Sequence, residues 1–140
     1  NAAENMVPTT TGAAIAVTKT LPQLIGKFDG LSVRVPTPVV SLSDVTALLR
    51  RDVTVEQVNG AFKKAAQSNF YQGILGVSEE PLVSRDFIGN SCSGIVDLPL
   101  TKVVDGNLIK VMVWYDNEWG YSNRLVELVA DVGHYLQNQA

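Results

Sequence analysis

At 140 residues, the chain has the length of one domain and can bury roughly two thirds of the surface that it exposes when unfolded. Hydrophobic residues make up 46% and charged residues 18%, which is typical of a globular protein and excludes a disordered one. No apolar run approaches the roughly 20 residues of a membrane span, and the net charge of −3 without a basic block predicts no nucleic-acid partner. The single cysteine favours a reducing, cytoplasmic setting. Because the chain begins at Asn1, we interpret it as a piece of a longer protein.

The first third of the chain predicts a helix followed by two extended segments. The small, alanine-rich residues after Gly12 favour a helix with a threonine as its N-cap. This helix should end near Pro22 or at Gly26, since glycine supplies a stop. Residues 31–35 alternate with period 2 and predict a strand, which the following prolines end or confine to a sheet edge. Residues 39–49 are predicted to form a second extended segment.

A second helix is predicted to begin after Thr54. Thr54 and Gln57 have the N-cap and N3 spacing of a capping box. The apolar stripe of this helix comprises Val55, Val58, Ala61, Phe62, Ala65 and Ala66. Three short strands are predicted after it, at residues 73–77, 82–83 and 91–98.

The last third of the chain predicts a hairpin and a long helix. Asp105-Gly106-Asn107 is a hairpin signal that joins residues 101–104 to a strand at 108–115, whose two faces are both largely apolar. The apolar stripe of the helix that follows comprises Tyr121, Leu125, Leu128, Val129, Val132 and Leu136. The polar tail, residues 137–140, should fray. Together these elements indicate an α+β fold, a mainly antiparallel or mixed sheet with helices packed on one face.

Two features of the first third could bind an anion. Thr11 and Gly12 lie at a predicted helix N-terminus, where unpaired N–H groups, a hydroxyl and the helix dipole favour phosphate or sulfate. Taken alone, these residues are better explained as an ordinary helix cap. The guanidinium of Arg34 matches the geometry of phosphate, although a surface pairing with a carboxylate is the simpler explanation of any single arginine.

A polar segment, residues 116–120, follows the predicted strand at 108–115. Ligands tend to be held at such strand ends in sheets flanked by helices. The side chain of Asn117 can donate and accept hydrogen bonds at once, which suits an amide ligand, but asparagine is also common in turns. Tyr115 and Tyr121 are interpreted from the sequence first as core aromatics.

Cys92 and His134 do not have the pattern of a nucleophile with its base. Cys92 lies in a run that reads as a strand, with no helix N-terminus or cation nearby in sequence to lower the thiol pKa. His134 falls near the frayed end of the last helix. We therefore expect no catalytic dyad of Cys92 and His134, and interpret Cys92 as a small core residue. The sequence also has no G-x-G-x-x-G motif and no recognisable metal-ligand spacing, so no metal is predicted.

Five motifs, in order along the chain, resemble phosphorylating glyceraldehyde-3-phosphate dehydrogenase. The longest is Trp-Tyr-Asp-Asn-Glu-Trp-Gly-Tyr-Ser-Asn-Arg at residues 114–124. The others are at residues 8–14, 33–38, 73–76 and 81–87. The resemblance covers only the carboxyl-terminal half of that family. It implies that residues 1–140 are a single substrate domain, without the Rossmann domain that binds NAD or NADP, the catalytic cysteine or the general base.

The resemblance also implies roles for individual residues. Thr11 and Gly12 would hold the attacking inorganic phosphate, and Arg34 would grip the phosphate of the substrate. The residues implied near the nicotinamide are Asn117, which binds its carboxamide, Tyr121, which packs near the ring, and the supporting neighbours Tyr115 and Glu118. Full-length members of the family form homotetramers, so a homo-oligomer is expected.

The implied reaction converts glyceraldehyde 3-phosphate and phosphate to 1,3-bisphosphoglycerate, with reduction of NAD or NADP, as in glycolysis. The chain alone is expected to fold without catalysing. Ile15 stands where the family usually has lysine, and Val39 where it usually has asparagine. Two alternatives stay open: a stand-alone phosphate-binding or assembly module of the same fold, and the branch of the family that acts on erythrose 4-phosphate.

Overall fold

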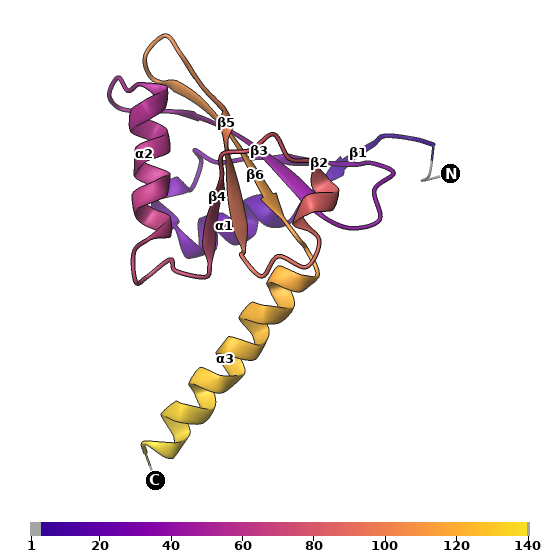
Figure 1. The fold of residues 1–140 in the computed structure, drawn as a ribbon, viewed down its shortest axis with the longest axis vertical. Helices are drawn as coiled ribbons and strands as arrows, with labels where there is room; N and C mark the ends of the chain where they lie inside the picture. Colours follow the sequence, from indigo (N-terminus) through magenta and orange to yellow (C-terminus); the bar gives the residue numbers. More distant parts are fainter. Residues whose placement is uncertain (1–3, 140) are drawn as a thin grey trace. The chain divides into compact units, whose positions relative to one another are not determined.

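The computed structural model describes residues 4–139. The chain divides into two compact units, Asn1–Pro38 and Val39–Ala140. Figure 1 shows the helices and strands of both units. Each unit is built around its own sheet, one of two strands and one of four.

The first unit is a strand, a helix and a second strand. Strand β1 (Val7–Thr10) pairs antiparallel with β2 (Leu31–Arg34). Helix α1 (Ala13–Thr20) and a short 3-10 helix (Pro22–Leu24) connect them. The helix therefore ends just before Pro22, as predicted, and Gly26 follows with a left-handed φ of 72°. Strand β1 was not predicted, because its sequence contains a proline and lacks alternation.

The second unit contains a mixed four-stranded sheet in the order β3-β6-β5-β4. Its strands are β3 (Ser41–Leu48), β4 (Leu75–Ser78), β5 (Gly94–Val104) and β6 (Leu108–Tyr115). Strand β6 pairs antiparallel with both β3 and β5, whereas β4 runs parallel to β5. Together with the three α-helices of residues 4–139, this mixed sheet confirms the predicted α+β class.

Helix α2 (Val55–Ala66) covers one face of this sheet. Val58 of the helix joins Val96, Leu98 and Val111 in a buried cluster. The predicted capping box is confirmed: the Thr54 hydroxyl accepts from the Gln57 N–H at 3.3 Å, and the Gln57 side chain accepts from the Thr54 N–H at 3.0 Å. This box fixes the start of α2 and hence the residues that face the sheet.

The opposite face has a smaller core around Phe87. Its ring stacks on that of Trp114, with 5.3 Å between the centroids. Val40 and Ile95 complete this buried group. A 3-10 helix, Ser84–Phe87, carries the phenylalanine. Both faces of β6 therefore have apolar partners, as predicted from the apolar residues on each face of this strand.

Two strand predictions were wrong. Residues 91–98 and 101–104 were expected as separate strands, but β5 runs unbroken over 11 residues. Its register against β6 shifts between Asp97 and Lys102, and this irregularity accommodates a proline within the strand. Residues 82–83 form no strand, because the Val83 N–H donates to the Asp86 carboxylate at 2.8 Å and starts the 3-10 helix.

The predicted hairpin is confirmed at Asp105 and Gly106, which adopt left-handed φ values of 49° and 76°. Helix α3 (Trp119–Gln137) follows β6 and extends away from the sheet (Figure 1). Residues 137–140 were predicted to fray. Residue 137 is the last of α3 and residues 138–139 form a turn, whereas Ala140 lies outside the described residues. None of the helices described has both the length and the apolar character needed to cross a membrane.

Candidate functional site

A cavity of about 320 Å³ lies at the carboxyl end of β6, where α3 begins. Its lining residues are Ser93, Tyr115, Asp116, Asn117, Gly120, Tyr121 and Arg124. The cavity thus brings together three of the four residues singled out in this region. Glu118 does not line it, and its backbone N–H instead donates to the Asp116 carboxylate.

Asp116 is the centre of the turn between β6 and α3. It is 3% exposed, and its carboxylate accepts from the backbone N–H groups of Trp119 and Gly89 at 2.8 Å and of Glu118 at 3.0 Å. The Trp119 bond contributes most to lowering the Asp116 pKa, followed by the Gly89 bond. A carboxylate that stays ionised here satisfies N–H groups at the start of α3.

Asn117 is exposed and lies immediately after this buried carboxylate. Its Oδ1 accepts from the Ser41 hydroxyl, in the neighbouring strand β3, at 3.4 Å. Among the described residues, no hydrogen bond occupies its Nδ2. The amide can therefore offer a donor to a ligand at the mouth of the cavity.

The two tyrosines differ in burial. Tyr115 is half-buried as the last residue of β6. Tyr121, by contrast, is 69% exposed, so its interpretation as a core aromatic was wrong. It lies in the first turn of α3, whose apolar face is exposed along its length. Tyr121 is nevertheless one of the residues that line the cavity.

The start of α3 rests directly on the loop that carries Cys92. A Cβ added to Gly120 would lie 2.9 Å from the Cys92 carbonyl oxygen, so only glycine allows this approach. Cys92 precedes β5 and is not in a strand, and both the first turn of α3 and a cation, Arg124, lie near it in space. The prediction of a strand at Cys92 was therefore wrong, and the neighbours of Cys92 in space are distant from it in sequence. Burial nevertheless dominates and raises the pKa of the Cys92 thiol, with Arg124 opposing that shift.

His134 lies far from Cys92 along α3. Fourteen residues separate it from Gly120, which corresponds to about 21 Å of helix. The raised thiol pKa and this separation leave Cys92 without an activating base. No group of three or more His, Cys, Asp or Glu residues that could hold a metal occurs in the part of the chain that the structure describes.

Four residues of the cavity were given no individual role by the sequence analysis: Ser93, Asp116, Gly120 and Arg124. Asp116 had a usable signal, because aspartate just before a helix often accepts from its first N–H groups. The other three residues had no such signal in the sequence. Ser93 and Arg124 meet across 31 residues of sequence, and Gly120 is required by its close approach to Cys92, which is 28 positions away (120 − 92).

The remaining candidate residues lie in the first unit. The Thr11 hydroxyl accepts from the Ala13 N–H at 3.1 Å, and Gly12 occupies the N-cap of α1. Arg34 is exposed and ends β2 opposite Val7, whereas Thr11 follows the other end of the same ladder. Four residue steps, about 13 Å of strand, separate the backbones of Thr11 and Arg34, which suits two anion positions better than one.

Comparison with known proteins identifies close relatives. Residues 1–117 match the model of a family described as "Glyceraldehyde 3-phosphate dehydrogenase, C-terminal domain". Over 135 residues, the chain is 52% identical to glyceraldehyde-3-phosphate dehydrogenase 2 of Streptomyces avermitilis, covering 96% of this chain and 40% of the relative. Identity is 55% over 129 residues to the enzyme of Geobacillus stearothermophilus (92% and 38%) and 58% over 127 residues to that of Priestia megaterium (91% and 38%). The chain therefore spans about two fifths of the length of these relatives.

Proposed function

Because this chain belongs to the glyceraldehyde-3-phosphate dehydrogenase family, as its C-terminal domain, we propose that it supplies the substrate domain of such an enzyme. The full-length protein would convert glyceraldehyde 3-phosphate, inorganic phosphate and NAD or NADP to 1,3-bisphosphoglycerate and the reduced nicotinamide, as in glycolysis. The observation that carries the proposal is the cavity in which the Asn117 amide and the Tyr121 ring come together at a strand end.

The residues of this cavity suit a nicotinamide. The ring, when bound, accepts the hydride from the aldehyde carbon of the substrate. Asn117 would orient the ring, because an amide with an available donor is complementary to a carboxamide. Tyr121 would form the adjacent wall, with Tyr115 and Glu118 as supporting neighbours. The choice between NAD and NADP would belong to the nucleotide-binding half.

The first unit would bind the two phosphate groups of the reaction. Thr11 and Gly12 offer a hydroxyl and a helix N-terminus to the attacking phosphate. Arg34 offers an exposed guanidinium to the phosphate of the substrate. Their separation along the β1–β2 ladder supports this division of roles.

The nucleophile and general base would come from the missing half of the protein. We therefore expect the 140-residue chain to form no NADH from glyceraldehyde 3-phosphate, phosphate and NAD, whereas the full-length protein does so. Absorbance of NADH measures both. Turnover by the isolated chain would contradict this division, and an inactive full-length protein that still binds phosphate would favour a stand-alone binding or assembly module.

Two variants of the full-length protein test the residue roles. Arg34→Ala should raise KM for glyceraldehyde 3-phosphate by roughly 10- to 100-fold, because a charge-assisted bond to phosphate contributes about 1.5–3 kcal/mol. Asn117→Ala should instead raise KM for NAD or lower kcat. Arg50→Ala, which removes another exposed arginine, is the matched control and should change neither. An unchanged KM for the aldehyde in Arg34→Ala would refute the assignment of Arg34.

The cellular location and the assembly of the protein are also part of the proposed function. We propose a cytoplasmic enzyme that forms a homo-oligomer, a tetramer when full length. The single cysteine and the exposed apolar residues of α3 support these two expectations respectively. The relatives compared above are all named glyceraldehyde-3-phosphate dehydrogenases, which favours that substrate over erythrose 4-phosphate.

A further inference from the structure

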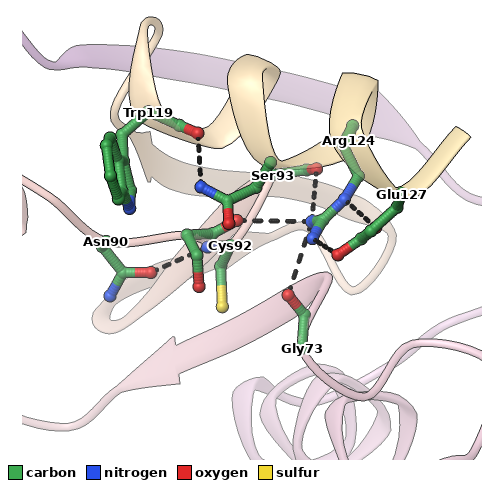
Figure 2. A network of polar contacts seen from close by, with 9 residues as sticks. Gly73, Asn90, Cys92, Ser93, Trp119, Arg124 and Glu127 are labelled. Carbon is green, nitrogen blue, oxygen red and sulfur yellow. Dashed lines mark hydrogen bonds and ion pairs between the residues drawn. The ribbon is translucent and has the colours of Figure 1, made fainter. Parts of the chain in front are cut away.

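Arg124 joins three segments of the second unit. Its Nη1 donates to the Ser91 carbonyl and the Ser93 hydroxyl at 3.3 Å and to the Gly73 carbonyl at 3.4 Å. Its Nε donates to Glu127 at 2.6 Å, and its Nη2 forms an ion pair with the same carboxylate. Figure 2 shows the guanidinium between the loop before β5 and the turn before β4, with Glu127 on its outer side. One side chain of α3 is thereby bonded to two loops that are distant from it in sequence.

These bonds lie at the wall of the cavity already described. Arg124 lines the cavity together with Tyr121, which precedes it by three residues on α3 and so lies on a neighbouring part of the helix surface. The arginine side chain is only 25% exposed, so its bonds are partly shielded from water. Any rotation or tilt of α3 that broke the Arg124 bonds would also move the Tyr121 ring.

The first turn of α3 is fixed at two points close to the cavity. Asp116 bonds to the N–H groups at the start of the helix, and Gly120 packs against the Cys92 carbonyl. Both contacts lie at one end of a 19-residue helix, so they set its position but leave its direction poorly determined. Arg124, one turn further on, adds bonds to two loops and so restricts the direction of the helix further.

We propose that Arg124 is a positioning residue for cofactor binding. It holds Tyr121 over the cavity at Asn117, so that the nicotinamide meets a wall that is already in place. The effect of Arg124 on cofactor binding rests on the proposed function. Its effect on the mobility of α3 does not depend on that function. A positioning residue should affect cofactor binding far more than phosphate binding, because the phosphate-binding residues lie in the first unit.

The experiment uses the full-length enzyme and three variants. Arg124→Met keeps the apolar stem and removes every donor, and Arg124→Lys keeps one charged group. Glu127→Gln is the control, because it weakens only the outer ion pair and leaves the bonds to the two loops. Arg124→Met should raise KM for NAD about 10-fold with less than about 2-fold change in KM for phosphate. Arg124→Lys should lie between the wild type and Arg124→Met, and the control should resemble the wild type.

Hydrogen exchange of the full-length protein without cofactor provides a readout independent of turnover. In Arg124→Met, peptides covering residues 117–124 should exchange faster, while peptides of β5 and β6 stay unchanged. An active wild type whose variants show neither the change in KM nor the faster exchange would overturn the inference. The inference would also be overturned if both Arg124 variants showed worse values of all kinetic constants and faster exchange in all peptides, because that result indicates general destabilisation. A wild type without turnover, combined with the local exchange effect, would refute the proposed function and leave the positioning of Tyr121 supported.

Discussion

At the scale of single residues, Asp116 holds the candidate site together. Three backbone N–H groups from two segments donate to one buried carboxylate, so the turn that carries Asn117 depends on the charge of Asp116. Asp116→Ala should destabilise the second unit by at least about 2 kcal/mol, because buried donors are left without an acceptor. Urea unfolding at neutral pH measures this loss. Asp131→Ala, at an exposed carboxylate on α3, is the control and should have little effect.

The same carboxylate predicts a dependence on pH. The pKa of Asp116 is lowered in the folded protein, so its stabilising contribution is fully present above the ordinary value of 3.8 and is lost as the pH falls through the lowered pKa. The difference in unfolding free energy between wild type and Asp116→Ala should therefore be constant at neutral pH and shrink below about pH 4. A difference that stays constant down to pH 2 would contradict this assignment.

Gly120 and Gly133 form a matched pair within α3. A Cβ at Gly120 would lie 2.9 Å from a backbone oxygen, which cannot swing away as a side chain can, whereas a Cβ at Gly133 meets nothing within 4 Å. Gly120→Ala should therefore cost about 1–3 kcal/mol. Gly133→Ala should stabilise the helix by roughly 0.5–1 kcal/mol. Thermal unfolding of both variants tests the pair, and equal shifts in Tm would show that α3 does not rest on the Cys92 loop.

At the scale of elements, the segments that were predicted correctly carry local signals. The capping box at Thr54 and the turn at Asp105-Gly106 bring together residues that are adjacent or three apart in sequence, so each was visible without knowledge of the fold. Strand β1 and the continuity of β5 were not predicted, because pairing partners determine them. The chain's α+β class followed from the correct elements alone.

In the candidate site, too, the residues recognised from the sequence belong to a local motif, whereas the contacts between distant residues were not predicted. Asn117 and Tyr121 were found because the motif that contains them resembles a known family and follows a predicted strand. Arg124 belongs to that motif too, yet its bonds reach residues 31 to 51 positions away in the sequence. Only the folded chain reveals that it contacts the Cys92 loop. Sequence therefore identified the residues proposed to face a ligand better than the arginine whose partners are distant in the chain.

At the scale of the whole molecule, α3 carries an apolar surface with no partner among the described residues of its unit. The stripe formed by Tyr121, Leu125, Leu128, Val129, Val132 and Leu136 has exposed fractions between 48% and 69%. Its regular spacing is typical of a helix that packs against another element. The chain spans about two fifths of the length of its relatives, and the described residues of this unit leave the stripe open to solvent.

We therefore predict that the 140-residue chain self-associates through this stripe. Contiguous exposed apolar surface favours association in water, and a second copy offers an identical stripe. Size-exclusion chromatography at two concentrations should show an apparent mass that rises with concentration. Leu128→Lys with Val132→Lys should shift the protein towards the monomer, because charges would then have to be buried in the contact. Ala130→Lys, which adds charge on the opposite side of α3, is the control and should leave association intact. Elution as a monomer at both concentrations, or an equal effect of the control, would show that this stripe does not mediate contacts between copies.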